Sequence, residues 1–220
     1  MSLEAVKRNG HNLSLFCCET EGKYDIPIIR PLETDEWPGR LDWVSFNNAN
    51  ADRDRGNHGV HFFIDDYLFQ RTWNDPVRYA MLVREFRAVL TPDFSLYTDY
   101  PKAVQIYNHW RKHWLGAYWQ SLGIPVIPSV CWSDEDSYGW CFDGEPKHAA
   151  VAVSSVGTQK SGRTRELFMN GYNEMLKRLE PERILFFGDT PGGCKGNIEQ
   201  YDAFYKAVSS RRKTPRHREG

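Results

Sequence analysis

The sequence lacks the features that mark several large classes of protein. Its apolar runs stay well below the roughly 20 residues that a membrane-spanning helix requires, and residues 1–12 contain no apolar core of a secretory signal. The five cysteines form no Cys-x-x-Cys pair and their number is odd, which disfavours a disulfide framework and a zinc site. We therefore expect a soluble, cytoplasmic protein with free thiols, no metal centre and no membrane contact.

Familiar catalytic signatures are also missing. There is no Gly-x-Ser-x-Gly elbow, no His-Glu-x-x-His helix and no cysteine cluster of a radical enzyme. Residues 188–196 (GDTPGGCKG) resemble a phosphate loop, but Cys194 precedes Lys195 and breaks the Walker spacing. His109 and His113 stand four residues apart on a predicted helix, a pattern that usually belongs to a helix surface. Candidate site residues must therefore be inferred from their positions relative to the predicted strands and loops.

Charge is unevenly distributed along the 220 residues. The net charge is -1, whereas residues 209–220 carry +4, so the rest of the chain carries -5. Such a tail is typical of a disordered arm that touches nucleic acid, and a solvated terminus is the alternative. The predicted nucleic-acid contacts are Arg211, Arg212, Lys213, Arg216 and Arg218.

The remaining chain is expected to form one domain. Three prolines interrupt residues 1–40, which should wrap irregularly around an α/β domain spanning residues 41–208. The charged stretch 49–59 is predicted to be a mobile surface loop. Oligomeric state is left undetermined.

Short apolar runs and helical patterns alternate through this domain. The runs predict six strands, near residues 42–46, 61–64, 88–92, 126–132, 151–153 and 184–187. A helix should begin at Asp75 and Pro76, and others should cover about 99–122, 165–179 and 199–209.

The apolar runs are continuous, as in parallel strands that are buried on both faces. This indicates a mainly parallel sheet of about six strands with helical crossovers. Polar residues follow nearly every strand, which favours a (β/α)-barrel-like form over the alternative, an open doubly wound sheet.

Several stretches resemble a known family. They are VHFFIDDY (60–67) with PDFSLY (92–97), GAYWQ (116–120) through PVIP (125–128) to WSD (132–134), and VSSVG (153–157). Over about residues 40–190 these are similar to a bacterial and phage family, domain of unknown function 4417. The resemblance implies a protein often carried by mobile elements, and it assigns no catalytic residue.

A candidate site follows from the strand ends, because the ends of parallel strands share one edge of a sheet. Asp65, Asp93 and Asp134 are the candidate catalytic carboxylates; the alternative is that they cap helices or close turns, as we expect for Asp66 and Asp99. Predicted substrate contacts are Asn47, Tyr97, Trp132, Ser154, Thr158, Gly188 and Asp189.

Paired carboxylates are typical of enzymes that pass through oxocarbenium-like transition states. The sequence therefore favours an enzyme, a hydrolase or a glycosyl or nucleobase transferase, acting on nucleic acid or a nucleotide. No cofactor is predicted, and Mg²⁺ held by the aspartates is the alternative. The rival function is a non-catalytic protein of a mobile element that binds nucleic acid or a host protein.

Overall fold

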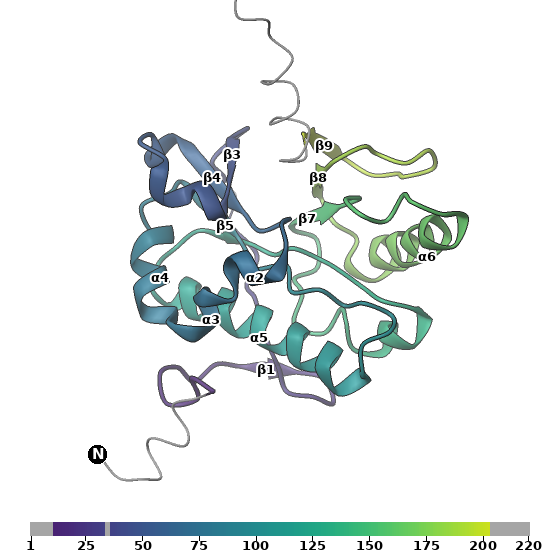
Figure 1. Ribbon diagram of the computed structural model, residues 1–220, viewed down its shortest axis with the longest axis horizontal. Helices are drawn as coiled ribbons and strands as arrows, with labels where there is room; N and C mark the ends of the chain where they lie inside the picture. The colour runs from purple at the N-terminus through teal and green to yellow at the C-terminus, as the bar shows by residue number, and fades with distance from the viewer. Residues whose placement is uncertain (1–10, 34–35, 203–220) are drawn as a thin grey trace, which may run out of the picture.

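A computed structural model describes residues 11–33 and 36–202 of the chain. Its core is two parallel sheets in which each strand lies beside its predecessor in the sequence (Figure 1). The first sheet contains β3 (Asp42–Ser45), β4 (His58–His61), β5 (Ala88–Leu90) and β6 (Val126–Ile127). The second contains β7 (Ala150–Ser154), β8 (Arg183–Phe187) and β9 (Ile198–Tyr201).

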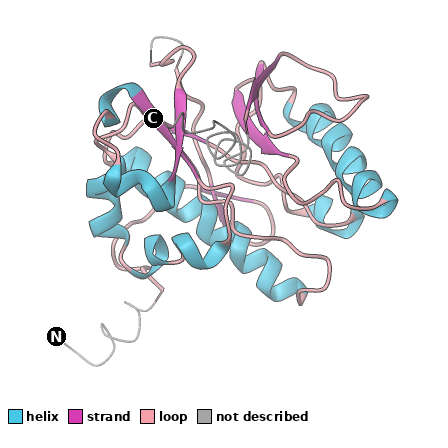
Figure 2. Ribbon diagram, turned by 45° about the horizontal axis from the view of Figure 1, so that its top comes forward, coloured by secondary structure: helices cyan, strands magenta, loops and turns pink. Residues whose placement is uncertain are grey.

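Helices connect the strands and lie on the outer side of the two sheets (Figures 1 and 2). Three short helices follow β4, and longer ones follow β5 and β7; a 3-10 helix follows β6. Their bounds are α2 (Asp66–Phe69), α3 (Arg71–Asn74), α4 (Pro76–Val83), α5 (Lys102–Ser121), η3 (Glu135–Gly139) and α6 (Gly162–Leu179).

The two sheets are joined at a seam around Ser129. Its backbone forms a parallel bridge to Ala152 of β7, and Val130 N donates to Ala152 O at 2.8 Å. On the other side, Ser129 N donates to Thr91 Oγ1 at 2.8 Å and its hydroxyl donates to Thr91 O at 2.9 Å. All of these groups are buried, so the seam satisfies polar atoms that would otherwise destabilise the core.

Aromatic side chains fill the space between the facing sheets. The rings of Trp43 and Phe63 lie 5.7 and 4.9 Å from the ring of Phe187. His61 packs against the same phenyl ring at 5.2 Å, and burial lowers the pKa of this imidazole to about 3. The sheets therefore share one core although they are separate in hydrogen bonding.

The sheets do not close into a barrel. Among the described residues, no backbone pairing joins the edge strands β3 and β9. Side chains bridge them instead: Arg40 donates to Glu199 Oε1 at 3.2 Å and to Gln200 O at 3.0 Å. The parallel α/β class predicted from the sequence is confirmed, whereas the predicted barrel is not. The strand order within each sheet also lacks the reversal that defines a doubly wound sheet.

Helix boundaries follow the local signals in the sequence. Asp75 caps α4 by accepting from Arg78 N at 3.1 Å, and Pro76 occupies the first helical position. Gly123, with φ of +75°, follows the end of α5. Ser161 and Thr164 form a capping box at the start of α6. The predicted helices in these three regions are confirmed.

Other local predictions were wrong. Residues 198–201 form strand β9 rather than the start of a helix, because they complete the second sheet beside β8. The predicted loop 49–59 contains parts of the 3-10 helices η1 (Phe46–Ala51) and η2 (Arg55–Asn57), and its end belongs to β4. Arg55 holds this segment through the carbonyls of Asn50 and Asp52.

The N-terminal segment contains a small hairpin of β1 (Thr20–Glu21) and β2 (Ile26–Pro27), which packs against α5. The predicted tail at residues 209–220, with its five basic side chains, lies outside the described residues. Across the described part of the chain, no helix combines the length and apolar character needed to cross a bilayer.

Gly171 provides a test of the packing of α6. A Cβ atom at this position would lie 2.1 Å from the indole of Trp132, so Gly171→Ala should lower the free energy of unfolding by about 1–3 kcal/mol. Gly162→Ala on the same helix is the matched control, since nothing lies within 4 Å of its added Cβ. Urea unfolding of both variants checks this expectation. Stabilisation by Gly171→Ala, the ordinary effect of alanine inside a helix, would show that the contact is absent.

Candidate functional site

A cavity of about 660 Å³ opens where β4, β5, β6 and β7 end. Its lining comes from the segments that directly follow these strands, together with the first turns of α6. Because the strands are parallel, their carboxyl ends meet at this edge on both sides of the seam. The volume lies in the range of pockets that bind small molecules.

Most of the cavity wall is apolar, with polar groups at a few places. The apolar part includes Phe63, Leu96, Val130, Trp132, Val153 and Phe168. The polar part includes Asp65, Asp93, Ser95, Ser133, Thr158 and Lys160. Such a lining fits a ligand with a flat or apolar body and a small number of polar substituents.

Asp93 has the most unusual environment of the polar groups in this cavity. Burial raises the pKa of its carboxyl group to about 6, although the charge of Lys112 acts in the opposite direction. The Cys131 thiol lies beside it, and burial raises the pKa of this thiol well above its ordinary range. Asp93 Oδ1 is buried and has no hydrogen-bond partner among the described residues. A carboxyl group in this state can hold or release a proton near neutral pH.

The other two predicted carboxylates differ in their position. Asp65 is exposed and lines the cavity; it precedes α2 but makes no capping hydrogen bond with its side chain. Asp134 does not line the cavity, because its carboxylate accepts from Lys102 Nζ at 2.7 Å. The structure thus brings together two of the three predicted aspartates.

Asp66 is neither the helix cap nor the turn residue that the sequence predicted, because its carboxylate binds a distant segment. Its carboxylate accepts from both the backbone N and the hydroxyl of Ser95, the latter at 2.8 Å. Asn108 donates to Ser95 O at 2.8 Å. Asp66 therefore holds the loop after β5, which carries Asp93, against the segment after β4.

Four of the seven predicted substrate contacts line the cavity, namely Tyr97, Trp132, Ser154 and Thr158. Trp132 forms part of the cavity wall: its indole N–H donates to Leu167 O at 3.3 Å and its ring packs on Phe168.

Asn47, Gly188 and Asp189 do not line the cavity. Gly188 donates to Tyr201 O and accepts from the Gln200 amide, so it extends the pairing of β8 with β9. The backbone oxygen of Asp189 accepts from the Ser155 hydroxyl at 2.7 Å. Asn47 lies in η1.

Several groups in the cavity were not predicted from the sequence. Cys131 and Ser133 flank Trp132 in the sequence, and Lys160 lies two residues after Thr158. The Ser133 hydroxyl is buried and lacks a partner within the described residues. Each of these groups lies within two residues of a predicted contact, and this proximity was the signal by which the sequence could have indicated them.

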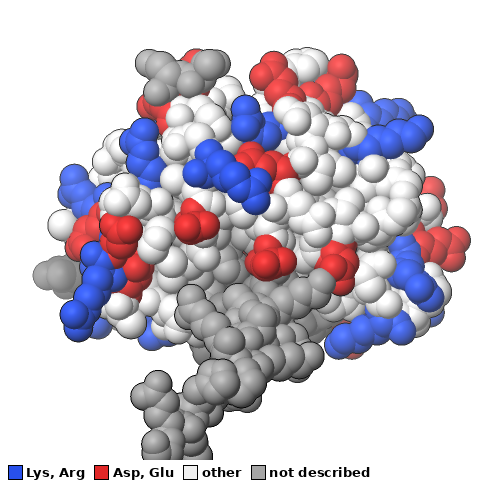
Figure 3. Space-filling view, turned by 90° about the horizontal axis from the view of Figure 1, so that it is seen from above, with Lys and Arg blue, Asp and Glu red and all other residues white. Residues whose placement is uncertain are grey.

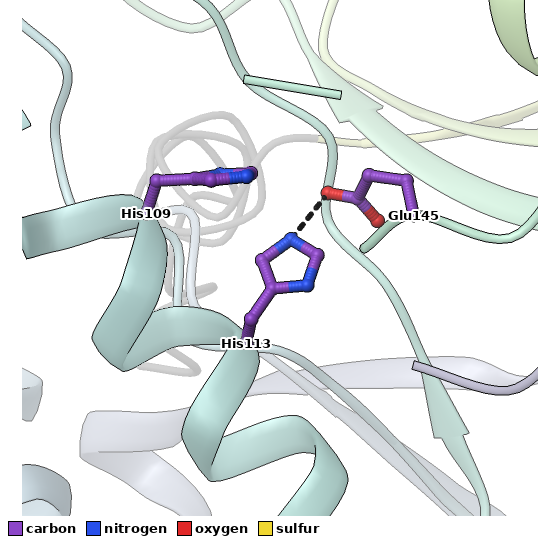
Figure 4. A group of neighbouring side chains, drawn as sticks. All are labelled: His109, His113 and Glu145. Carbon is purple, nitrogen blue, oxygen red and sulfur yellow. Dashed lines mark hydrogen bonds and ion pairs between the residues drawn. The ribbon is translucent and has the colours of Figure 1, made fainter. Parts of the chain in front are cut away.

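A buried charged network includes Lys112, His113 and Glu145, and Figure 4 shows the last two beside His109. Lys112 Nζ donates to Ser129 O at 2.7 Å and to Glu145 Oε1 at 2.8 Å. His113 Nε2 lies 3.0 Å from the same carboxylate oxygen, and His113 Nδ1 donates to Pro27 O. Burial opposes the charge of Lys112, but Glu145, Cys131 and Asp93 act together in the opposite direction and raise the pKa of the ammonium group.

The predicted surface position of the histidine pair was wrong, since His109 and His113 are both buried. With Glu145 they place one potential metal ligand each within 4.8 Å of one another. However, Lys112 already donates to the carboxylate oxygen that faces His113, and a dication would add charge beside a buried ammonium. We therefore interpret the group as a hydrogen-bonded network that links α5 to the hairpin and the seam.

Comparison with protein families shows to which family the chain belongs. Residues 18–203 match the model of a family described as Domain of unknown function (DUF4417). The chain belongs to this family. The resemblance noted in the sequence is thereby confirmed.

Relatives of the chain occur in phages. It is 42% identical to Gene 1 protein of Mycobacterium phage L5 over 170 residues, which cover 77% of this chain and 73% of that protein. It is 41% identical to Gene 1 protein of Mycobacterium phage D29 over 165 residues, 75% of this chain and 60% of the relative. No solved structure matches the chain. A phage-associated protein is thus supported, and the family name states no activity.

The Asp93 carboxyl group should make stability depend on pH. A folded-state pKa of about 6 against an ordinary 3.8 means that the folded protein binds this proton more tightly than the unfolded chain does. Above pH 6 the difference destabilises the fold by about 3 kcal/mol, and this cost disappears as the pH falls toward 4. Asp93→Asn should therefore raise the free energy of unfolding at pH 8 but not at pH 4. Urea unfolding at both pH values measures the effect; equal effects at the two pH values would contradict it.

Proposed function

We propose that this protein is a metal-independent enzyme that cleaves or transfers a glycosidic or N-glycosidic bond, with a nucleotide or nucleic acid as substrate. The observation that carries the proposal is the Asp93 carboxyl group, which lines a largely apolar cavity and has a pKa near 6. Such a group suits general acid catalysis, because it still holds a proton close to neutral pH.

In this mechanism the two cavity aspartates have separate roles. The protonated Asp93 donates its proton to the leaving oxygen or nitrogen as the bond to the anomeric carbon breaks. The exposed carboxylate of Asp65 stabilises the positive charge that develops on the sugar, or directs the incoming nucleophile. The apolar wall near Trp132 and Phe168 would contact a sugar or base. A nucleotide substrate would place this reaction in the cytoplasm of the host cell.

The face of the molecule seen in Figure 3 supports a compact ligand better than a long nucleic-acid track. On the face seen in Figure 3, Lys and Arg side chains alternate with Asp and Glu around the described surface, and no broad basic stripe is visible there. Extended binding of a duplex normally requires such a stripe. A nucleotide, or a single base presented by a strand, fits the cavity volume.

The rival function is a protein that binds a nucleotide, nucleic acid or a host protein without chemistry. The apolar lining of the cavity favours this alternative equally, since binding pockets share it. The two differ in turnover, so product release decides between them.

We expect Asp93→Asn to reduce kcat by about 10²- to 10⁴-fold, because the amide cannot donate the carboxyl proton. Asp134→Asn is the matched control and should retain activity within a few fold, as Asp134 pairs with Lys102 outside the cavity. Release of free base or sugar from nucleosides, nucleotides and oligonucleotides is measured by chromatography, with Mg²⁺ and with EDTA. Loss of activity in EDTA would favour the Mg²⁺ alternative. Calorimetric binding without any product would favour the binding protein.

The activity of the intact enzyme should fall as the pH rises through about 6. Only the protonated Asp93 can act as the general acid, and its carboxyl group loses that proton over this range. The dependence of kcat/KM on pH measures this limb for the free enzyme. A rate that increases steadily from pH 5 to pH 8 would assign Asp93 the role of a base instead.

The basic C-terminal segment can be tested separately. Removal of residues 209–220 should weaken binding to oligonucleotides and reduce its salt dependence, by about 0.9 in the log–log slope for each phosphate that the segment neutralises. Fluorescence anisotropy of the full and shortened chains at several salt concentrations provides the measurement. If neither chain binds nucleic acid at low salt, a nucleotide remains the only candidate substrate.

A further inference from the structure

Proton donation by Asp93 would leave a negative charge in a buried place. Its Oδ1 atom has no hydrogen-bond partner among the described residues, and the Cys131 thiol beside the carboxyl group is a weak donor, so the new carboxylate would gain little from local hydrogen bonds. A buried charge without compensation is strongly disfavoured. The site therefore needs a positive charge near Asp93.

Lys112 is placed to supply that charge. Its side chain is 1% exposed in the middle of α5, and its ammonium group is held at 2.7 Å from Ser129 O and 2.8 Å from Glu145 Oε1. Ser129 bonds to Thr91, two residues before Asp93, and directly precedes Val130 and Cys131, which line the cavity. Of its three N–H bonds, two thus have acceptors among the described residues.

We propose that Lys112 is a positioning residue of this site, whose buried ammonium stabilises the Asp93 carboxylate formed when the proton passes to the leaving group. The catalytic part of this role rests on the proposed function. The electrostatic link between the two residues requires no substrate and can be measured alone.

The other charged groups around Asp93 act against its ionisation. Asp66, which belongs to α2, and Glu145, on the loop after η3, both raise the pKa of the Asp93 carboxyl group, as burial does. Lys112 has a larger influence than either of them and acts in the opposite direction. The Cys131 thiol also lies beside the carboxyl group and favours its ionised form. Lys160 also lines the cavity, but Lys112 is the cation of the described residues that acts on the Asp93 carboxyl group.

The experiment follows the titration of Asp93 directly. Carboxyl ¹³C NMR of the full chain, with the signal assigned by its loss in Asp93→Asn, should give a midpoint near pH 6. Lys112→Met should raise that midpoint by about one pH unit or more, because the stabilising charge is lost. His109→Gln is the matched control: it also changes a buried polar side chain of α5, and it should leave the midpoint unchanged.

Lys112→Met leaves Glu145 without its lysine partner and risks unfolding. The double variant Lys112→Met/Glu145→Leu removes both charges and guards against this outcome. Its midpoint should also lie above that of the wild type, since Lys112 influences Asp93 more than Glu145 does. A midpoint unchanged or lowered in a folded variant without Lys112 would overturn the proposal.

The activity assay then separates the two proposals. If the wild type releases base or sugar, the limb of its pH profile near pH 6 should move upward with the NMR midpoint in Lys112→Met. A shifted midpoint in a protein without turnover would refute the proposed enzyme and retain the electrostatic link. Turnover with an unshifted midpoint would refute the role of Lys112 and retain the enzyme.

Discussion

The seam at Ser129 is the constraint on which the rest of the structure depends. Its side chain and backbone amide bind Thr91, its bridge to Ala152 joins the second sheet, and its carbonyl accepts from Lys112. Neither sheet alone contains the cavity, because the lining comes from the segments after β4, β5 and β6 on one side and from β7 and the segment after it on the other. The seam therefore fixes the distance between the two halves of the candidate site.

Much of the fold could be predicted from local patterns. The apolar runs marked six of the seven parallel strands, although the run at 61–64 shares only His61 with β4. Asp75, Ser161 and Gly123 mark helix boundaries through interactions within a few residues. The missed strand, β9, illustrates the limit. Its residues are mostly half-buried or exposed, without a continuous apolar run, and they form a strand because they pair with the edge of β8, which no local pattern reveals.

The sequence predicted which edge of the sheets holds the candidate site better than it predicted the individual residues of that site. Strand order brought Asp65 and Asp93 into one cavity, as parallel pairing requires. Asp134 pairs instead with Lys102, 32 residues away in the chain, and Lys112 was hidden inside a helix whose partners Ser129 and Glu145 lie 17 and 33 residues away. Such contacts between distant segments depend on tertiary packing, and a single sequence does not encode them in any local spacing.

The bridged edges of the two sheets have a consequence for self-association. Unpaired edge strands offer free backbone groups to neighbouring molecules and are sites of aggregation. Here both edge strands are only four residues long, and Arg40 spans from one side to the other, with its guanidinium 4.7 Å from the Tyr201 ring centre. The Arg40 bridge thus places a charged side chain across the open edges of β3 and β9. Charged side chains at such edges disfavour the addition of a strand from another copy of the chain.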